Sequence, residues 1–480
     1  MDKRLKYRII LLGSLCFFAT SAQADTLREA LARAYATNPT LTGARAGQRA
    51  NDENVPLARA RGLPGLDLSG AYTENLQTSS SASPARQVAG RLNFDVPIYQ
   101  GGAVKNAIRA ADSRVDAGQA NLRATEASVF SQVVGAYMDV LRDEAIVGLN
   151  RNQVKVLQTN LEATRDRFEV GDLTRTDIAQ SQSRLAFAQS QLEGAESNLI
   201  GSRERYVQLV GSEPGSLEQP PPLPNLPTST ESAVEKALAS NPDLIAAKKN
   251  EEAARFDIGS ARASRLPRVS LVADKSYANF LNSLTVKIPG FNTSQSAENA
   301  TAGVQLTMPL FNGGAPSAQV RQAQARSSQA IEQSIEAERS IIAQTRSAFA
   351  SLRASNAVIV STESAVAATA LSLEGVRAEN TVGNRSILDI LNAEQEYLNA
   401  QVQLVSARRN AYVAGFSLLA AMGQAEARDL GLDGGVLYDP ETNYKRVRNS
   451  IWDWDSDPKP KPVATQTVDT QAQNPSVKDQ

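Results

Sequence analysis

The spacing of apolar residues changes twice along the first half of the chain. At the start, apolar residues recur every three or four positions, which predicts a short helix that ends before Pro39 and a second helix over 41–61. The spacing then becomes alternate, which predicts two strands over 66–73 and 88–96, each with one apolar and one polar face. A serine-rich stretch predicts a polar loop over 75–83.

Helical spacing returns after the second strand and continues for an unusual length. Residues 103–168 contain no proline and only occasional glycines, so one helix of about 100 Å is predicted. Val170 and Gly171 then predict a glycine-mediated helix stop, and a return helix follows over 174–210. The two arms are therefore expected to be antiparallel. The return helix is the shorter one, so the rest of the long helix is expected to pack against 41–61.

The same order of elements occurs a second time. Pro97, Gly101, Gly171 and Gly211 have counterparts 212 positions later at Pro309, Gly313, Gly383 and Gly423, whereas Asn38 and Asn241 are 203 positions apart. The copies of the predicted elements fall at 229–239, 244–265, 269–273, 304–310, 317–380 and 386–422. A longer polar loop at 276–299 accounts for the nine residues between the two offsets. Such agreement identifies an internal repeat.

The predicted strands need partners that one chain does not provide. Alternation of this kind fits a soluble antiparallel sheet with one wet face, but two isolated hairpins are marginal in water. It also fits a membrane barrel whose strands turn apolar residues to lipid and polar residues to a water-filled lumen. A barrel needs about eight strands or more, so four strands cannot close one. Three chains would supply twelve.

Composition excludes most enzyme chemistry. Histidine is absent and Cys16 is the only cysteine, so zinc sites, thiol nucleophiles and histidine acid–base catalysis cannot be built. No catalytic residues, metal ligands or cofactors are predicted, and an enzyme is the least favoured class. The net charge of −1 and the aromatic content of 5% also give no sign of a nucleic-acid partner.

The remaining segments complete a division into five parts. Residues 1–24 have a basic front, an apolar run and a small-residue cleavage site, so they are expected to be a signal peptide that is removed after Ala24. Leu15 before Cys16 argues against lipidation there. No later run of about 18 consecutive apolar residues predicts a spanning helix. The expected parts are the signal peptide, a first repeat over 25–212, a proline-rich linker over 213–228, a second repeat over 229–424, and a C-terminal segment over 425–480 that is disordered after about residue 449.

From residue 25 to about 445 the chain resembles the TolC-type outer-membrane channels of efflux and type I secretion. The resemblance lies in the duplicated helix, strand pair and helical hairpin, in the Pro-x-(Tyr/Phe)-x-Gly-Gly sequences that begin at Pro97 and Pro309, and in the Val-Gly turns. It implies a mainly α fold with a small membrane β part. Three copies would form a coiled-coil α-barrel and a 12-stranded β-barrel. The implied function is passive export of small molecules or proteins, and the implied partners are outer-membrane lipid, a periplasmic adaptor and an inner-membrane transporter of the ABC, RND or a similar class.

The resemblance also implies roles for residues at the two Val-Gly turns. Asp389 matches the first acidic position of the family's periplasmic constriction, but the second is an amide, Asn392, so one ring of three carboxylates is expected. Arg385 matches a basic latch residue, Thr176 and Asp177 match its partners, and Asn380 replaces a tyrosine of the latch. Expected contacts with the adaptor are Val170, Gly171, Leu173, Thr174, Val382, Gly383 and Ser386.

Simpler interpretations stay open for these positions and for the whole chain. An acidic residue in the first turn of a helix, such as Asp389 or Asp177, can serve only to stabilise the helix N-terminus. The principal alternative function is a periplasmic adaptor, which should have one hairpin and a compact β domain. A secreted coiled-coil scaffold is the next alternative, but it gives no reason for strands with one apolar face.

Overall fold

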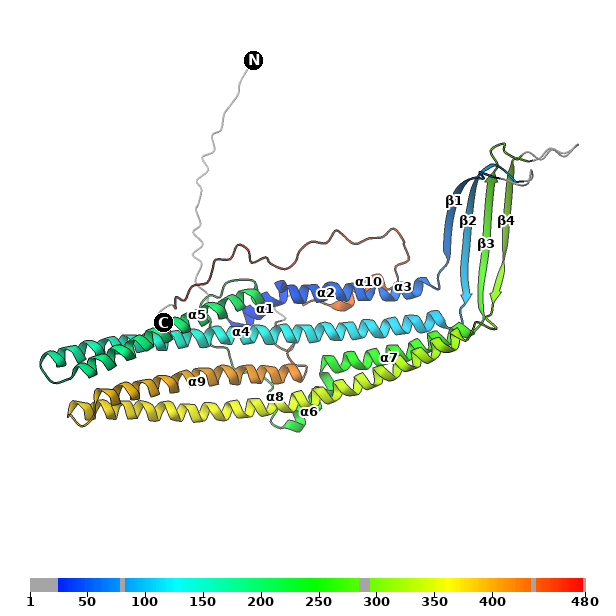
Figure 1. Cartoon of the computed structure of the whole chain (residues 1–480). Helices are drawn as coiled ribbons and strands as arrows, with labels where there is room; N and C mark the ends of the chain where they lie inside the picture. Colours follow the sequence, from blue (N-terminus) through cyan, green and yellow to red (C-terminus); the bar gives the residue numbers. More distant parts are fainter. Residues whose placement is uncertain (1–24, 78–82, 285–293, 433–436, 478–480) are drawn as a thin grey trace, which may run out of the picture.

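The computed structural model of the chain describes residues 25–77, 83–284, 294–432 and 437–477. Figure 1 shows long helices lying side by side and a sheet at the end of the helical body opposite the hairpin turns. The predicted signal peptide, with Cys16, lies outside the described residues, as do parts of both predicted strand-connecting loops.

Each repeat contributes two strands to one sheet. The strands are β1 (Gly65–Glu74), β2 (Arg86–Tyr99), β3 (Arg268–Asn279) and β4 (Ser296–Thr307). All neighbouring pairs are antiparallel and the order is β1-β2-β3-β4, so the two hairpins are joined through β2 and β3. Within this chain β1 and β4 are therefore edge strands.

The second repeat reproduces the strand register of the first. Gly65 pairs with Asp95 in the first hairpin. Arg268, 203 positions after Gly65, pairs with Thr307, 212 positions after Asp95. The two offsets found in the sequence therefore describe one three-dimensional unit that occurs twice.

The extent of the second hairpin was predicted wrongly. Residues 276–279 and 296–299 were assigned to a loop, but they continue β3 and β4, and β4 ends at Thr307 rather than at 310. Their polar side chains hid the strand pattern. The backbone ladder continues through them because each residue pairs directly with one on the opposite strand, from Ser276 with Asn299 to Asn279 with Ser296.

The hairpin helices form as predicted. The long helices are α4 (Ala103–Glu169) and α8 (Ala315–Thr381), of 67 residues each, and the return helices are α5 (Arg175–Val210) and α9 (Ile387–Ala421). One ion pair of the first hairpin recurs in the second with its charges exchanged. Arg151 pairs with Glu196 at 2.7 Å, and Glu363 pairs with Arg408 at 3.1 Å, each residue 212 positions further on.

In each repeat, an Asn-Pro pair joins the end of the return helix to the start of a further helix. The helices α1 (Leu27–Thr37) and α6 (Thr230–Ser240) each end at an Asn-Pro pair. Asn38 caps the next helix and its Nδ2 donates to the carbonyl of Leu209 at 2.9 Å, at the end of α5. Asn241 does the same with Ala421 at 2.9 Å, at the end of α9. These contacts place α2 (Pro39–Asp52) and α7 (Pro242–Arg262) along the part of the long helix that the return helix leaves uncovered.

The predicted helix over 41–61 is in fact two helices. The helix α2 is interrupted at Glu53, and the chain continues as α3 (Asn54–Ala60). Pro56 has no backbone N–H and so removes the hydrogen bond that would continue the helix. Its counterpart 203 positions later is Gly259, and α7 continues through that position to a short 3₁₀ turn, Ala263–Arg265.

The largest core cluster lies at the middle of the helical body, where both repeats meet. It contains residues of α1, of the middle of α4, and of the C-terminal ends of α5 and α9. Tyr137 is fully buried there, and its hydroxyl lies 2.8 Å from the carbonyl of Asp25 and 2.6 Å from that of Glu218. Burial raises the pKa of this phenol. The start of the first repeat and the linker are thereby tied to α4.

The described part of the C-terminal segment contains a helix that was not predicted. This helix, α10 (Pro440–Val447), is capped by Asp439 and packs on α2. Residues 451–477 contain no helix or strand, and the last of them run along the first hairpin. There Arg203 donates to the carbonyl of Asn474 at 2.6 Å and Arg151 to that of Pro475 at 3.0 Å. Disorder beyond residue 449 stays a prediction.

Candidate functional site

Both hairpin turns are built on a glycine with a positive φ. Gly171 has φ 87° and Gly383 has φ 83°, a conformation that glycine adopts at little cost. The amide of Asp172 bonds to the carbonyl of Arg167 at 2.9 Å, and the amide of Asn384 bonds to that of Glu379 at 3.0 Å. Both hairpins thus end in the predicted glycine-mediated stop. Val170 and Val382 are 75% and 70% exposed, so each turn presents an apolar side chain at its tip.

The acidic residues after the turns are parts of helix caps. Ser386 donates from its amide at 2.9 Å and from its hydroxyl at 2.7 Å to the Asp389 carboxylate, and Thr174 makes the same two bonds to Asp177. These bonds lower the pKa of both carboxyl groups, because they stabilise the charged form. The simpler interpretation therefore accounts for both residues within one chain, and a role in a constriction stays a prediction.

The predicted latch residues of one chain form two separate pairs, Asn380 with Arg385 at the second turn and Thr176 with Asp177 after the first. Arg385 Nε forms an ion pair with Glu379 across its own turn at 2.7 Å, and Asn380 donates to the carbonyl of Arg385 at 2.7 Å. Thr176 is exposed on the other hairpin. In the part of the chain that the structure describes, no hydrogen bond or ion pair joins Arg385 to Thr176 or Asp177. A latch between different subunits stays a prediction.

Asn392 joins the two hairpins near their tips. Its Oδ1 accepts a hydrogen bond of 2.6 Å from Arg184 Nη2, and Arg184 belongs to α5. Sequence reasoning assigned Asn392 to the constriction and missed Arg184. An arginine on an exposed helix face gives no sign of its partner before the fold is known.

A buried carboxylate also escaped prediction. Glu394 is 2% exposed on α9, where Arg377 of α8 forms an ion pair with it at 3.0 Å. Asn160 of α4 donates to both of its oxygens at 2.9 and 3.1 Å. Its spacing from the buried residues Leu391 and Leu398 was a signal that could have identified it. Glu394 thus ties three of the four hairpin helices together.

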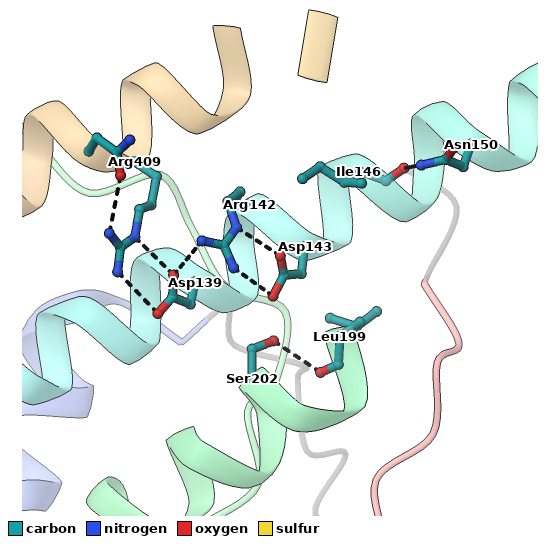
Figure 2. Close-up of polar contacts among 9 residues, drawn as sticks. Asp139, Arg142, Asp143, Ile146, Asn150, Leu199, Ser202 and Arg409 are labelled. Atoms are coloured by element: carbon teal, nitrogen blue, oxygen red, sulfur yellow. Dashed lines mark hydrogen bonds and ion pairs between the residues drawn. The ribbon is translucent and has the colours of Figure 1, made fainter. Parts of the chain in front are cut away.

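A second polar cluster lies further along the same seam (Figure 2). Arg409 of α9 forms an ion pair with Asp139 of α4 at 2.8 Å. Arg142 lies between two carboxylates of α4, at 2.9 Å from Asp139 and 2.8 Å from Asp143. This cluster fixes the second hairpin against the first at mid-length.

The two faces of the sheet differ in polarity. Directly paired residues share a face, and the pairs Leu66 with Phe94, Leu68 with Leu92, Leu271 with Val304, and Val269 with Leu306 make one face apolar. Leu68 is 80% exposed and Leu306 67% exposed. The opposite face is polar and includes an ion pair between Arg91 and Asp274. In the part of the chain that the structure describes, large apolar side chains on this face are thus exposed.

The helix α8 is also largely uncovered. By length and composition, one stretch of it could cross a membrane, a feature that the sequence analysis did not identify, and only 11% of that stretch is buried. Val360 and Leu371 are 66% and 70% exposed. However, Glu363 of α8 pairs with Arg408 of the adjacent α9. Because charged residues are costly in lipid, this ion pair indicates that the exposed surface of α8 contacts other helices rather than lipid.

A wide groove runs between α4 and α8 where α9 meets α7. Its volume is about 970 Å³, and small side chains such as Ser128, Ser131, Ser347 and Ser351 predominate in its lining. Asp243 is the only charged residue among those that line it. Such a surface offers few groups that could select one solute over another.

Comparison with known proteins gives consistent results. The family model described as "Outer membrane efflux protein" matches residues 30–212 and 233–424. The chain is 31% identical over 449 residues to the outer membrane efflux protein BepC of Brucella suis biovar 1 (strain 1330), with 93% of this chain and 96% of that protein covered. It is 26% identical over 480 residues to the outer membrane protein TolC of Escherichia coli (strain K12), with 95% and 96% covered. The crystal structure of the Campylobacter jejuni CmeC outer membrane channel superposes with a TM-score of 0.73 at 18% identity, covering 88% of this chain and 89% of that one.

Proposed function

Because this chain belongs to the outer membrane efflux protein family, we propose that three copies form one passive conduit across the outer membrane and through the periplasm. The chain is an outer-membrane channel protein and not an enzyme. In the proposed assembly, twelve strands form a barrel in the membrane and the helical hairpins form the wall of a periplasmic tunnel.

The observation that carries this proposal is the sheet, which has one exposed apolar face and whose outer strands β1 and β4 each pair on one side only among the described residues. Four strands are too few to close around a lumen. The free N–H and C=O groups of an exposed edge strand can pair with another strand. Lipid would cover Leu68 and Leu306, and the polar face with Arg91 and Asp274 would line the pore. The uncovered surface of α8 would lie against a neighbouring subunit.

The hairpin tips are proposed to form the periplasmic entrance. Three copies of Asp389 would make one ring of negative charge, which attracts cations and above all divalent ions. Its lowered pKa keeps this carboxylate charged at neutral pH. Arg385 is proposed to hold the entrance closed by contacts with Thr176 and Asp177 of a neighbouring subunit. Asn380 and Asn392 would lie at the same constriction.

The partners are proposed to act on these same tips. Val170, Gly171, Leu173 and Thr174 of the first turn, with Val382, Gly383 and Ser386 of the second, form the proposed contact with a periplasmic adaptor. An inner-membrane transporter would supply energy and choose the cargo, because the groove between α4 and α8 has few selective groups. Relatives differ in this respect: BepC is named an efflux protein, and AprF of Pseudomonas aeruginosa an alkaline protease secretion protein.

The proposed organisation keeps the sequence division. It consists of a signal peptide at 1–24, repeats at 25–212 and 229–424, a linker at 213–228 and a C-terminal segment at 425–480. Each chain would then contribute two repeats, so that a ring of three chains would contain six similar units.

Conductance in planar bilayers tests the conduit. The purified protein is expected to insert and conduct, and millimolar divalent cations are expected to block the current. Asp389→Ala should weaken that block several-fold, whereas Asp172→Ala, which removes an exposed carboxylate at the turn of the other hairpin, should change it little. A protein that stays in the aqueous phase without detergent and never conducts would overturn the conduit. A block unchanged by Asp389→Ala would remove Asp389 from the constriction.

A further inference from the structure

After α10 the chain forms a short loop that is held against the first repeat. The helix α10 packs on α2. Arg59 of α3 donates to the carbonyl of Arg448 at 2.6 Å, just beyond the end of α10. Arg446 Nη1 forms an ion pair with Asp457 at 2.9 Å. We call residues 448–457 the C-terminal loop, which is thus tied to the first repeat at one end and closed by an ion pair at the other.

Both tryptophans of the chain, Trp452 and Trp454, lie in the C-terminal loop. They are 71% and 87% exposed, and Ile451 beside them is 72% exposed. The amide of Asp455 bonds to the carbonyl of Trp452 at 3.3 Å, so the chain turns here. Aromatic rings are stabilised by leaving water, so three exposed apolar side chains at one turn indicate a surface that a partner covers. The matched family model ends at residue 424, so this loop is additional to the sequence that defines the family.

The C-terminal loop lies at the end of the sheet that adjoins the helical body, where Figure 1 shows α3 leading into β1. A cavity of about 740 Å³ separates the loop from α3 and the start of β1. Leu57, Leu63 and Leu66 line this cavity on one side, and Ile451 and Trp452 line it on the other. Leu66 is 66% exposed and belongs to the apolar face of the sheet. Exposed apolar side chains therefore continue from that face, past the start of β1, to the loop.

The charges around the two tryptophans do not favour a strongly charged partner. Asp453 and Asp455 are balanced by Lys459 and Lys461, which follow directly after the loop, and all four are exposed. Asp457 has its own ion pair. Nucleic acid or a strongly anionic lipid surface is therefore not attracted by net charge. A zwitterionic lipid surface fits, because tryptophan accumulates at the headgroup level, where its ring meets hydrocarbon and its indole N–H meets polar groups.

We propose that the C-terminal loop inserts the rings of Trp452 and Trp454 into the periplasm-facing leaflet of the outer membrane, beside the start of β1. The proposal rests on the proposed barrel, which places the apolar face of β1 in lipid, and it adds a membrane contact outside that barrel. Because α10 packs on α2 and Arg59 of α3 binds the start of the loop, this contact fixes the helical body at one height below the membrane.

Intrinsic fluorescence tests this proposal, because the chain has no other tryptophan. Trp452→Phe leaves Trp454 as the only reporter, and Trp454→Phe leaves Trp452. Each variant is reconstituted into phosphatidylcholine vesicles with and without brominated acyl chains, which quench an indole only when they come close to it. We expect brominated lipid to lower the emission of each variant about two-fold, as for a ring at the membrane interface. Replacing part of the lipid by anionic phosphatidylglycerol should leave this quenching nearly unchanged, because no net charge draws the loop to the surface.

Two control reporters, each in a Trp452→Phe/Trp454→Phe background, calibrate the measurement. Leu68→Trp is on the apolar face of β1 and should be quenched at least as strongly as the loop tryptophans. Phe187→Trp is on α5, at a position where the native side chain is 66% exposed. It should keep its full emission, because α5 lies in the part of the helical body away from the sheet (Figure 1).

The controls separate failure of this proposal from failure of the barrel. Quenching of Leu68→Trp without quenching of Trp452 and Trp454 would overturn the loop contact and leave the barrel intact. A blue-shifted but unquenched emission from the loop would also overturn the loop contact, because the rings would then be packed on protein, such as a neighbouring copy. If Leu68→Trp is not quenched either, the proposed barrel itself is contradicted.

Discussion

The two long helices α4 and α8 have the same length and the same place in their repeats, but very different surroundings. Of 67 residues each, α4 buries 24 and α8 buries six. The helix α4 lies between its own short and return helices and those of the second repeat, whereas α6, α7 and α9, which pack most extensively on α8, all belong to its own repeat. Four of the buried residues of α8 are spaced by seven, at 320, 327, 334 and 341, which is a single helical seam. The difference therefore comes from position in the chain, since α4 lies between the two repeats and α8 lies at an outer side of the second repeat.

The largest expected effect on this comparison comes from a core substitution in α4. Phe130 is fully buried, and Phe130→Ala should cost about 3–5 kcal/mol of stability through lost burial and the cavity left behind. The matched variant is Ile342→Ala, 212 positions later on α8, where the side chain is only half-buried and the cost should be about 1 kcal/mol. Denaturant unfolding in detergent measures both. A larger loss at Ile342 than at Phe130 would contradict the comparison.

A smaller effect is expected at the charged seam between the hairpins. Arg409→Ala removes one of the two arginines that pair with Asp139, and the side chains of Arg409 and Asp139 are about one-quarter exposed, so we expect a loss of about 1 kcal/mol. Ser197 is the counterpart of Arg409, and Ser197→Ala should change stability by less than about 0.5 kcal/mol. Thermal unfolding of the two variants provides the measurement. Equal losses of stability in the two variants would mean that this ion pair does not stabilise the contact between the hairpins.

The smallest effect is expected at the tips, where the two hairpins should behave alike. The caps lower the pKa of Asp177 and Asp389, so each cap stabilises its tip above the unfolded carboxyl pKa of about 4 and loses this contribution as the pH falls through the lowered value. Hydrogen exchange at residues 174–177 and 386–389, corrected for intrinsic rates, should therefore show constant protection from pH 5 to 8. Ser386→Ala should weaken protection in the second tip alone. A change in wild-type protection between pH 5 and 8 would contradict this account.

Local structure could largely be predicted from the sequence. The bounds of α4, α5, α8 and α9 follow from proline-free runs and glycine stops, and the Thr174 and Ser386 caps follow from the residues just after each turn. Pro56 is visible in the sequence, but its effect was overlooked. The ends of β3 and β4 were missed because polar residues continue a strand wherever a neighbouring strand pairs with them.

Contacts between distant segments could not be predicted in the same way. The pairing of Arg184 with Asn392, the burial of Glu394 and the packing of α10 on α2 all depend on how the repeats dock. In the sequence, this docking of the repeats is reflected only in the matched offsets of 203 and 212 positions between corresponding residues. The candidate constriction stays a prediction for the same reason, because its residues would meet only between copies.

The mass of the detergent-solubilised, conducting protein tests the central claim most directly. That claim is that one chain supplies four of twelve strands and that further copies close both its open edges. Native mass spectrometry should give a species of three chains, and conductance should accompany that species alone. A single chain that conducts without partners would contradict the account.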